Sequence, residues 1–133
     1  MTFLLVTIIL FISFLLLLGI IEFYFHNRYL SQIPIRIHVN GSRGKSSVVR
    51  LIAAGLRGAG IPTIAKVTGS SPRIIDLKGN DLKIHRLRTA SIGEQITMIK
   101  EFSKYKPKAI VIECMAVMPQ YQWISEKKMI KST

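Results

Sequence analysis

The sequence predicts an α/β fold in which an N-terminal transmembrane helix precedes an incomplete, mostly parallel sheet with helices packed against it. Three observations support this class. An uncharged apolar run opens the chain, a glycine-rich loop joins an alternating strand to an amphipathic helix, and a short apolar strand that ends in an acid follows near the C-terminal end. We divide the chain into an anchor over residues 1–27 and a domain over residues 28–133.

The apolar run over residues 3–21 carries no charged side chain. About 20 residues at a rise of 1.5 Å are enough to cross the hydrocarbon core of a bilayer. A cleaved signal peptide would need a basic start and a small-residue cleavage site, but an aromatic cluster at 23–25 follows the run. A buried soluble helix is disfavoured because the run is apolar on every face. We therefore expect a retained single-pass anchor in the cell membrane.

The charge distribution predicts the orientation of this anchor. Residues 1–27 contain one charged side chain, Glu22, whereas the whole chain has 19 Lys and Arg against 7 Asp and Glu, a formal charge of +12. The positive-inside rule places the C-terminal part in the cytoplasm. Such a basic excess fits membrane lipid, an anionic substrate or merely a solvated basic surface. The basic residues are scattered, so no nucleic acid partner is expected, and the single Cys114 excludes an intramolecular disulfide.

The first strand, loop and helix follow the anchor directly. Ile and Val alternate with Arg and His over residues 35–39, which predicts a half-buried strand. The apolar face of the following helix is expected to comprise Val48, Leu51, Ile52 and Leu56. Gly58 and Gly60 supply its stop.

The loop between them has the composition of a nucleotide-phosphate site. It consists of Asn40, Gly41, Ser42, Arg43, Gly44, Lys45, Ser46 and Ser47. Glycines let successive N–H groups point at phosphate oxygens, and the helix start favours an anion. Lys45 is suited to the β- and γ-phosphates of ATP and Ser46 to Mg²⁺. The P-loop pattern would have Gly where this chain has Val39, and an ordinary glycine-rich turn is the alternative.

The remaining elements complete a parallel sheet with a small antiparallel insertion. We expect a strand over 63–67, a loop over 68–72, hairpin strands over 74–76 and 82–85 around a turn, and a helix over 92–104 with Ser91 and Glu94 in capping-box spacing. A buried strand over 109–113 and a weaker helix over 121–129 follow. The order is that of an incomplete P-loop-type α/β sheet.

Glu113 ends the buried strand 109–113, at the sheet edge where ligands bind in open α/β folds. If this strand neighbours strand 35–39, the carboxylate faces the phosphate loop and is suited to hold Mg²⁺. The alternative is a strand-terminal acid that reaches solvent.

Residues 39–47 resemble the ATP loop of the Mur-ligase superfamily, with Arg43 in place of its usual Asn. Together with the anchor and segments 66–69, 91–95 and 112–117, they resemble the membrane-linked, ATP-dependent subunit of poly-γ-glutamate (capsule) synthases. The resemblance extends to about Trp123. It implies the Mur-ligase central-domain fold.

The resemblance also implies a reaction: ATP activates the terminal carboxylate of polyglutamate as an acyl phosphate, and the amine of glutamate attacks it. Lys45 would be the catalytic phosphate ligand, loop residues 40–47 would cradle ATP, Ser46 and Glu113 would hold Mg²⁺, and Thr68 and Gly69 would form a substrate-side loop. The implied partners are glutamate or poly-γ-glutamate, other membrane subunits of the synthase and membrane lipid.

Some features of the superfamily find no counterpart along this sequence. The superfamily has further strands, a metal-ligating His and a closing domain after the acidic strand, whereas His26, His38 and His85 precede it. We expect His38 and His85 to be structural or solvated. We therefore expect a truncated fragment, an N-terminal third that is inactive alone. The alternatives are a non-catalytic, membrane-anchored nucleotide-binding or docking module, and a generic P-loop NTPase, which the absence of an apolar strand ending in Asp disfavours.

Overall fold

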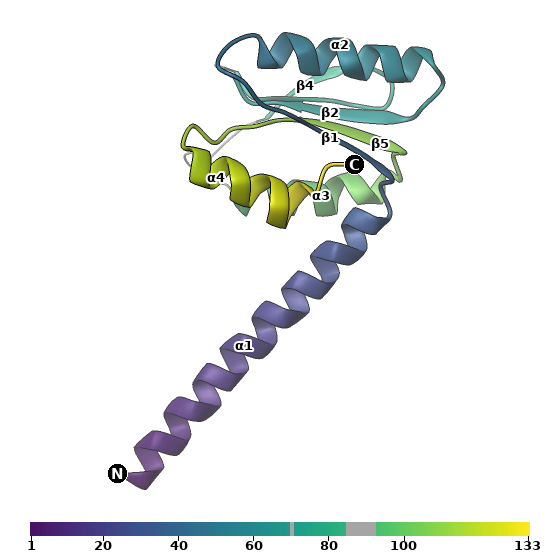
Figure 1. Ribbon diagram of the computed structural model, residues 1–133. Helices are drawn as coiled ribbons and strands as arrows, with labels where there is room; N and C mark the ends of the chain where they lie inside the picture. The colour runs from purple at the N-terminus through teal and green to yellow at the C-terminus, as the bar shows by residue number, and fades with distance from the viewer. Residues whose placement is uncertain (70, 85–92) are drawn as a thin grey trace.

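The computed structural model describes residues 1–69, 71–84 and 93–133, and these form a mixed α/β domain on a long N-terminal helix (Figure 1). The helices are α1 (Thr2–Ser31), α2 (Lys45–Gly58), α3 (Gly93–Lys104), α4 (Pro119–Ile124) and the π-helix η1 (Ser125–Ile130). The strands are β1 (Ile35–Val39), β2 (Thr63–Val67), β3 (Arg73–Ile75), β4 (Asp81–Lys83) and β5 (Ala109–Glu113).

The sheet has five strands in the order β1-β5-β2-β3-β4. The central strand β5 pairs in parallel with both β1 and β2, while β3 and β4 add an antiparallel hairpin. The expected parallel sheet with an antiparallel insertion is therefore present. The strand β5 is buried along its whole length, as its uninterrupted apolar sequence predicts.

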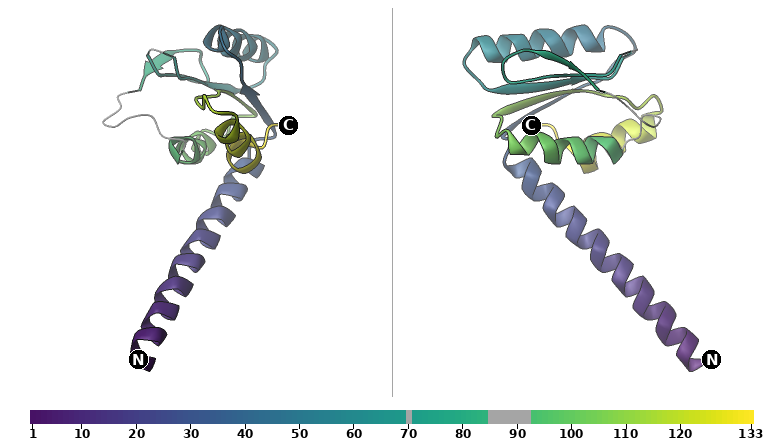
Figure 2. Two further views of the ribbon diagram at one scale, coloured as in Figure 1. Left: turned by 60° about the vertical axis from the view of Figure 1, so that its left-hand side comes forward. Right: turned by 180° about the vertical axis from the view of Figure 1, so that it is seen from behind.

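Helices cover the two faces of the sheet unequally (Figure 2). Helix α2 covers one face, which we call the α2 face; its core consists of Val49, Ala53, Ala65, Val67, Ile75 and Val111. Helix α3, the α4–η1 segment and the end of α1 cover the other, which we call the anchor face; its core consists of Leu30, Ile33, Ile64, Met98, Ile99, Phe102, Ile110, Ile112 and Ile130. Alternation along each strand sends neighbouring side chains to opposite faces.

The buried side of α2 differs from the expectation. Val49 and Ala53 are its fully buried residues, whereas Val48 is 43% and Leu51 72% exposed, although both were expected to face inward. Ile52 and Leu56, the other two expected residues, do pack against this core, so the buried row of Val49, Ile52, Ala53 and Leu56 is rotated only in part from the expected one. Ala53 contributes to that row but carries little hydrophobic signal.

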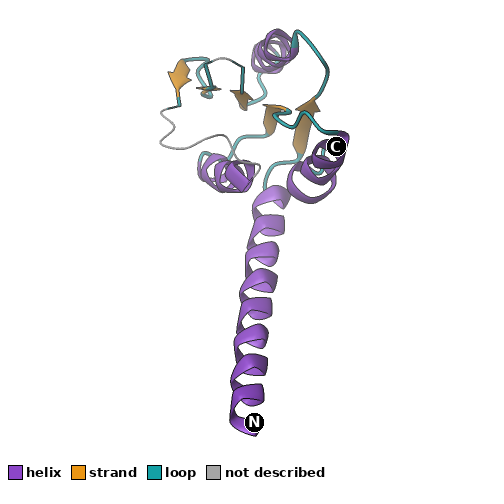
Figure 3. Ribbon diagram, turned by 90° about the vertical axis from the view of Figure 1, so that its left-hand side faces the viewer, coloured by secondary structure: helices purple, strands orange, loops and turns teal. Residues whose placement is uncertain are grey.

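Helix α1 continues without interruption past the expected anchor boundary at residue 27. It is 30 residues long, and within the described part of the chain it is the one helix long and apolar enough to cross a membrane. Its last turns pack under the sheet, where His26 and Leu30 are buried. Figure 3 shows α3 and the α4–η1 segment on either side of the top of α1.

The smaller elements agree with the sequence in type but not always in limits. The hairpin strands begin one residue earlier than expected, and the Asp76 carboxylate accepts N–H bonds from Lys78 and Asn80 in the turn. The expected last helix starts at Pro119 and becomes a π-helix from Ser125. The capping residue Ser91 and His85 lie outside the described residues.

Candidate phosphate-binding site

The glycine-rich loop joins β1 to α2 at the carboxyl edge of the sheet. Gly41 has a φ of 146° and Gly44 a φ of 76°, conformations that side chains disfavour. Gly44 is the N-cap of α2 and provides no side-chain cap. The N–H groups of the first turn of α2 therefore remain available for an anion, and the helix dipole adds to their attraction.

Lys45 lies at the start of α2 and folds back over this loop. Its Nζ donates to the carbonyl oxygen of Gly41 at 2.7 Å. Ser42, Arg43 and Ser47 are exposed around it. The ammonium group thus stands at the mouth of the loop, where it can neutralise an anion that the loop amides hold.

Glu113 connects the loop to the rest of the sheet edge. In the register of β1 and β5 it lies opposite Val39, and it is only 5% exposed. One carboxylate oxygen, Oε2, accepts the Ser46 hydroxyl at 2.8 Å and the Thr68 N–H at 2.8 Å. The acid does not extend into solvent, which was the alternative considered from the sequence.

The loop after β2 completes this junction. A Cβ atom on Gly69 would lie 3.2 Å from the Ser46 hydroxyl oxygen, so the backbone approaches Ser46 closely here. Residues from three separate segments, Ser46, Thr68 and Glu113, therefore meet at one point beside the phosphate loop. The sequence placed these residues in one site; their roles in binding stay predictions.

Two contacts from α4 and η1 were not anticipated. The Asn40 side chain donates to Gln122 Oε1 at 2.8 Å, and Gln122 in turn donates to the carbonyl oxygens of Ala116 and Val117. This links the start of the phosphate loop to the segment after β5. A pair of amides far apart in sequence leaves no local pattern, so only the fold reveals it.

The second contact joins His38 to Glu126. His38 Nδ1 donates to Glu126 Oε2 at 3.0 Å. Burial lowers the pKa of His38, and the interaction with Glu126 offsets this only in part. For Glu126, burial raises the pKa but the hydrogen bonds from Ser132 and His38 outweigh it, so the pKa lies below its ordinary value. A neutral His38 and a charged Glu126 thus brace β1 against the C-terminal segment.

The geometry fits a nucleotide–magnesium pair in its choice of ligands. Ser46 and Glu113 offer hydroxyl and carboxylate oxygens, the hard ligands that Mg²⁺ takes when nucleotide phosphates and water supply the others. Among the described residues no group of three or more His, Cys, Asp or Glu side chains is placed to hold a metal by itself. A metal here would thus depend on the phosphates of its nucleotide.

Comparison with known proteins relates this chain to two proteins of capsule or PGA synthesis. The chain is 41% identical over 121 residues to the capsule biosynthesis protein CapB of Bacillus anthracis, and 36% identical over 120 residues to the PGA synthase CapB of Bacillus subtilis (strain 168). The chain is homologous to both. The aligned regions cover 90% and 89% of this chain, but it spans only 26% and 30% of the length of these relatives. No family model and no solved structure matches it.

Proposed function

We propose that this chain supplies the ATP-binding part of a membrane-anchored amide ligase that extends poly-γ-glutamate. The observation that carries the proposal is the junction of Ser46, Thr68 and Glu113 beside the loop of Gly41 and Gly44. Homology to the two CapB proteins supports the product, because one is named a capsule biosynthesis protein and the other a PGA synthase. ATP and Mg²⁺ are the proposed cofactors.

In the proposed reaction a carboxylate oxygen of the polymer end attacks the γ-phosphorus of ATP and ADP leaves. The amine of a glutamate then attacks the acyl carbon, loses a proton and expels phosphate, which forms the amide. Lys45 and the loop amides would stabilise negative charge on the β- and γ-phosphates. Mg²⁺ would screen the phosphate charge when bound, and Ser46 and Glu113 would orient it.

The membrane location follows from α1 in this proposal. Crossing the bilayer with the basic domain on the cytoplasmic side would place the ATP site where ATP is available. The excess of Lys and Arg would also favour anionic glutamate and its polymer. Docking of other membrane subunits would then involve the exposed apolar length of α1.

The test is Lys45→Ala in the protein at its native locus, with Lys78→Ala as the control. Lys78 is an exposed lysine in the β3–β4 turn, away from the loop, so both variants lose one positive charge. One charge-assisted contact contributes about 1.5–3 kcal/mol, so we expect at least a tenfold loss of ATP affinity for Lys45→Ala. Polymer synthesis should fall with it, while the amount of protein in the membrane stays unchanged.

The two readouts separate the possible outcomes. Loss of ATP binding together with polymer synthesis in Lys45→Ala, but not in Lys78→Ala, supports the ligase. Unchanged ATP binding contradicts the phosphate site. Lost ATP binding with wild-type polymer synthesis identifies a nucleotide-binding docking module instead, the non-catalytic alternative.

A further inference from the structure

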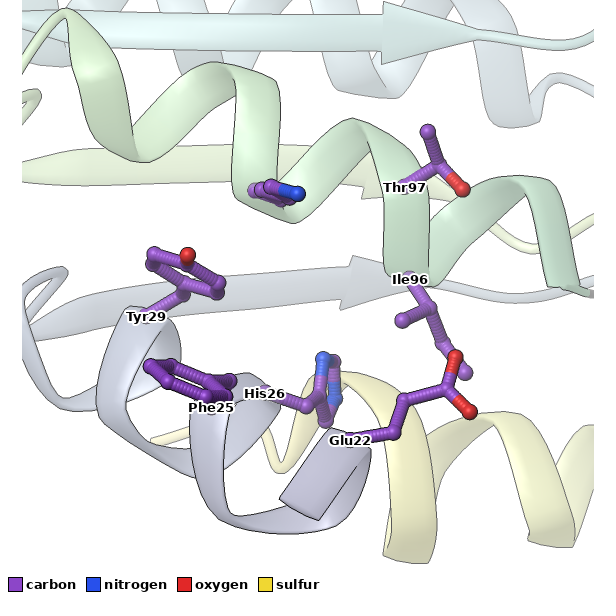
Figure 4. Close-up of a pocket in the computed structure, with 7 residues that line it drawn as sticks. Glu22, Phe25, His26, Tyr29, Ile96 and Thr97 are labelled. Carbon is purple, nitrogen blue, oxygen red and sulfur yellow. The ribbon is translucent and has the colours of Figure 1, made fainter. Parts of the chain in front are cut away.

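A cavity of about 440 Å³ opens between the end of α1 and α3, on the anchor face of the domain (Figure 4). Helix α1 contributes Glu22, Phe25, His26 and Tyr29 to its wall, and α3 contributes Ile96 and Lys100. We propose that this cavity binds the headgroup of a glycerophospholipid, its phosphate on Lys100 and its headgroup hydroxyls on Glu22 and His26. The proposal rests on α1 crossing the membrane, but not on the ligase reaction.

The first argument is the depth of the cavity relative to the apolar run. Glu22 follows the last residue of the run directly, and Tyr29 lies two turns further on. At a rise of 1.5 Å per residue these positions stand roughly 2–12 Å above the end of the apolar run. The headgroup layer adds about 5–8 Å to each side of the hydrocarbon core. The cavity therefore opens at the level of lipid phosphates and headgroups.

The second argument is a buried nitrogen without a partner. His26 is 5% exposed, and its Nε2 donates to the carbonyl oxygen of Met129 at 2.8 Å. Because Nε2 carries the proton, the neutral ring offers Nδ1 as an acceptor, and within the described part of the chain Nδ1 has no hydrogen-bond partner. Leaving such a buried group unsatisfied is unfavourable. A hydroxyl donor from a ligand would satisfy it.

The third argument is the pattern of charge and shape around that nitrogen. Glu22 is a second acceptor beside the His26 ring, and Figure 4 shows the two side chains next to each other on α1. Lys100 supplies the cation on the opposite helix. Two acceptors and one cation match a headgroup that has hydroxyl donors and one phosphate, as in phosphatidylglycerol. The rings of Phe25 and Tyr29, stacked with centroids 6.5 Å apart, give an apolar wall for the lipid glycerol and the first acyl carbons.

The surroundings of the cavity also favour an anionic lipid. Arg28 on α1, Lys104 on α3 and Lys127 and Lys128 on η1 are exposed on elements that flank the top of α1 (Figure 3). Each basic residue close to an anionic membrane surface adds to the attraction. This field is not specific, so the test must separate it from the cavity itself.

The test compares Lys100→Gln with Lys104→Gln in the full-length protein in detergent. Both residues are exposed lysines on α3, one turn apart, and only Lys100 lines the cavity. The probe is dihexanoyl phosphatidylglycerol, titrated while the shift in melting temperature is followed. We expect saturable stabilisation, an affinity at least tenfold weaker in Lys100→Gln, and less than a twofold change in Lys104→Gln.

A second variant tests the nitrogen. His26→Gln can still donate to Met129 from near the position of Nε2, but it has no counterpart of Nδ1. We expect this variant to bind phosphatidylglycerol about fivefold or more weakly than the wild type. If His26→Gln does not fold, the lysine pair still decides the matter, because both lysines are exposed.

The remaining probes identify the source of the phosphate. Dihexanoyl phosphatidylcholine, whose headgroup has no hydrogen-bond donors, should bind at least fivefold more weakly than phosphatidylglycerol, and sn-glycerol 3-phosphate more weakly still because it lacks acyl chains. Equal affinity for the two lipids, equal effects of the two lysine variants, or tighter binding of sn-glycerol 3-phosphate would each overturn the proposal. None of these outcomes depends on ATP or on polymer synthesis.

Discussion

The cores on the two faces of the sheet differ in the side chains that form them. The fully buried residues of α2 on the α2 face are the small Val49 and Ala53, and Ile52 and Leu56 pack at the edge of the same core. The anchor face is filled by larger side chains from α1, the α1–β1 connection, β2, α3, β5 and η1, and it also buries Lys66. The glycine-rich loop directly follows β1, so it and the N-terminus of α2 lie at the carboxyl ends of the parallel strands.

The buried polar groups show what the anchor face is built to join. Lys66 is fully buried on β2 and forms an ion pair with Glu94 on α3, with 3.2 Å between Nζ and Oε1. Ser125 on η1 donates to Gln95 on α3 at 2.6 Å. Polar pairs require specific partners, whereas apolar packing does not. The α2 face thus positions one site, and the anchor face specifies how several segments assemble around α1.

Truncating neighbouring residues of β5 should have the largest effect on stability. Ile110 faces the anchor side and Val111 the α2 side, and both are fully buried. Ile110→Ala should destabilise the protein by about 3 kcal/mol and Val111→Ala by about 2 kcal/mol. Denaturant titration of the protein in detergent measures both values.

For ATP affinity, the order of the same two variants should be reversed, with the larger effect in Val111→Ala. Val111 lies two residues before Glu113 on the same face, so Val111→Ala should lower ATP affinity, and Ile110→Ala should leave it unchanged under conditions where both are folded. Equal loss of ATP affinity in the two variants would show that the faces are not separate.

The buried ion pair should respond unequally to the loss of either partner. The side chain of Lys66 is 0% exposed, whereas that of Glu94 is 23% exposed. Glu94→Gln should therefore cost about 2 kcal/mol, because the ammonium cannot reach water. Lys66→Met should cost less, since the carboxylate of Glu94 can be hydrated. The melting temperatures of the two variants test this expectation. A higher melting temperature for Glu94→Gln than for Lys66→Met would contradict it.

Two glycines offer a smaller but cleaner contrast. Gly69→Ala should push the Ser46 hydroxyl away from Glu113, because the new Cβ would lie 3.2 Å from that oxygen. We expect ATP to bind about fivefold more weakly, a change of about 1 kcal/mol. The control is Gly55→Ala in α2, where a Cβ meets nothing within 4 Å. It should stabilise the helix by about 0.5–1 kcal/mol without changing ATP affinity.

Acidification should weaken the anchor face by a modest amount. The pKa of His38 is lowered from 6.5, so below about pH 6.5 the unfolded chain binds the proton first and the free energy of unfolding falls. Glu126, whose pKa is lowered from 4.5, adds a second loss only at more acidic pH. His38→Asn keeps a donor near Nδ1 but does not titrate, so its melting temperature should vary less between pH 7.5 and 5.5. An identical profile in wild type and variant would assign the effect to another group.

The sequence predicted local elements better than the contacts between distant ones. The alternation in β1 and the apolar run of β5 are strong strand signals, and both strands have the expected limits. The predicted buried face of α2 was wrong at Val48 and Leu51, because the small Ala53 gives only a weak hydrophobic signal for the row that is buried. The link between Asn40 and Gln122 and the braces on Glu126 depend on residues more than 80 positions apart, for which one sequence holds no periodic signal.

The candidate site was predictable to the extent that its residues lie at strand and helix ends. Glu113 ends β5, Thr68 follows β2 and Ser46 lies in the first turn of α2, and the parallel order of the sheet brings such ends to one edge. The cavity beside α1 was not foreseen, because its residues belong to α1 and α3, and nothing in the sequence of either helix shows that the two pack side by side.

The continuity of helix α1 determines how the domain is oriented around the helix axis. The helix is unbroken from Thr2 to Ser31, and Asn27 accepts a hydrogen bond from Lys131 at 2.6 Å. The apolar run is therefore joined to the sheet without a flexible hinge. In a bilayer, the azimuth of the phosphate loop around the membrane normal would then be fixed by helical phase. Deleting one residue between 22 and 25 would turn the whole domain by about 100° while lowering it by only about 1.5 Å. A neighbouring protein that contacts one side of α1 in the membrane would thus always face the same side of the domain.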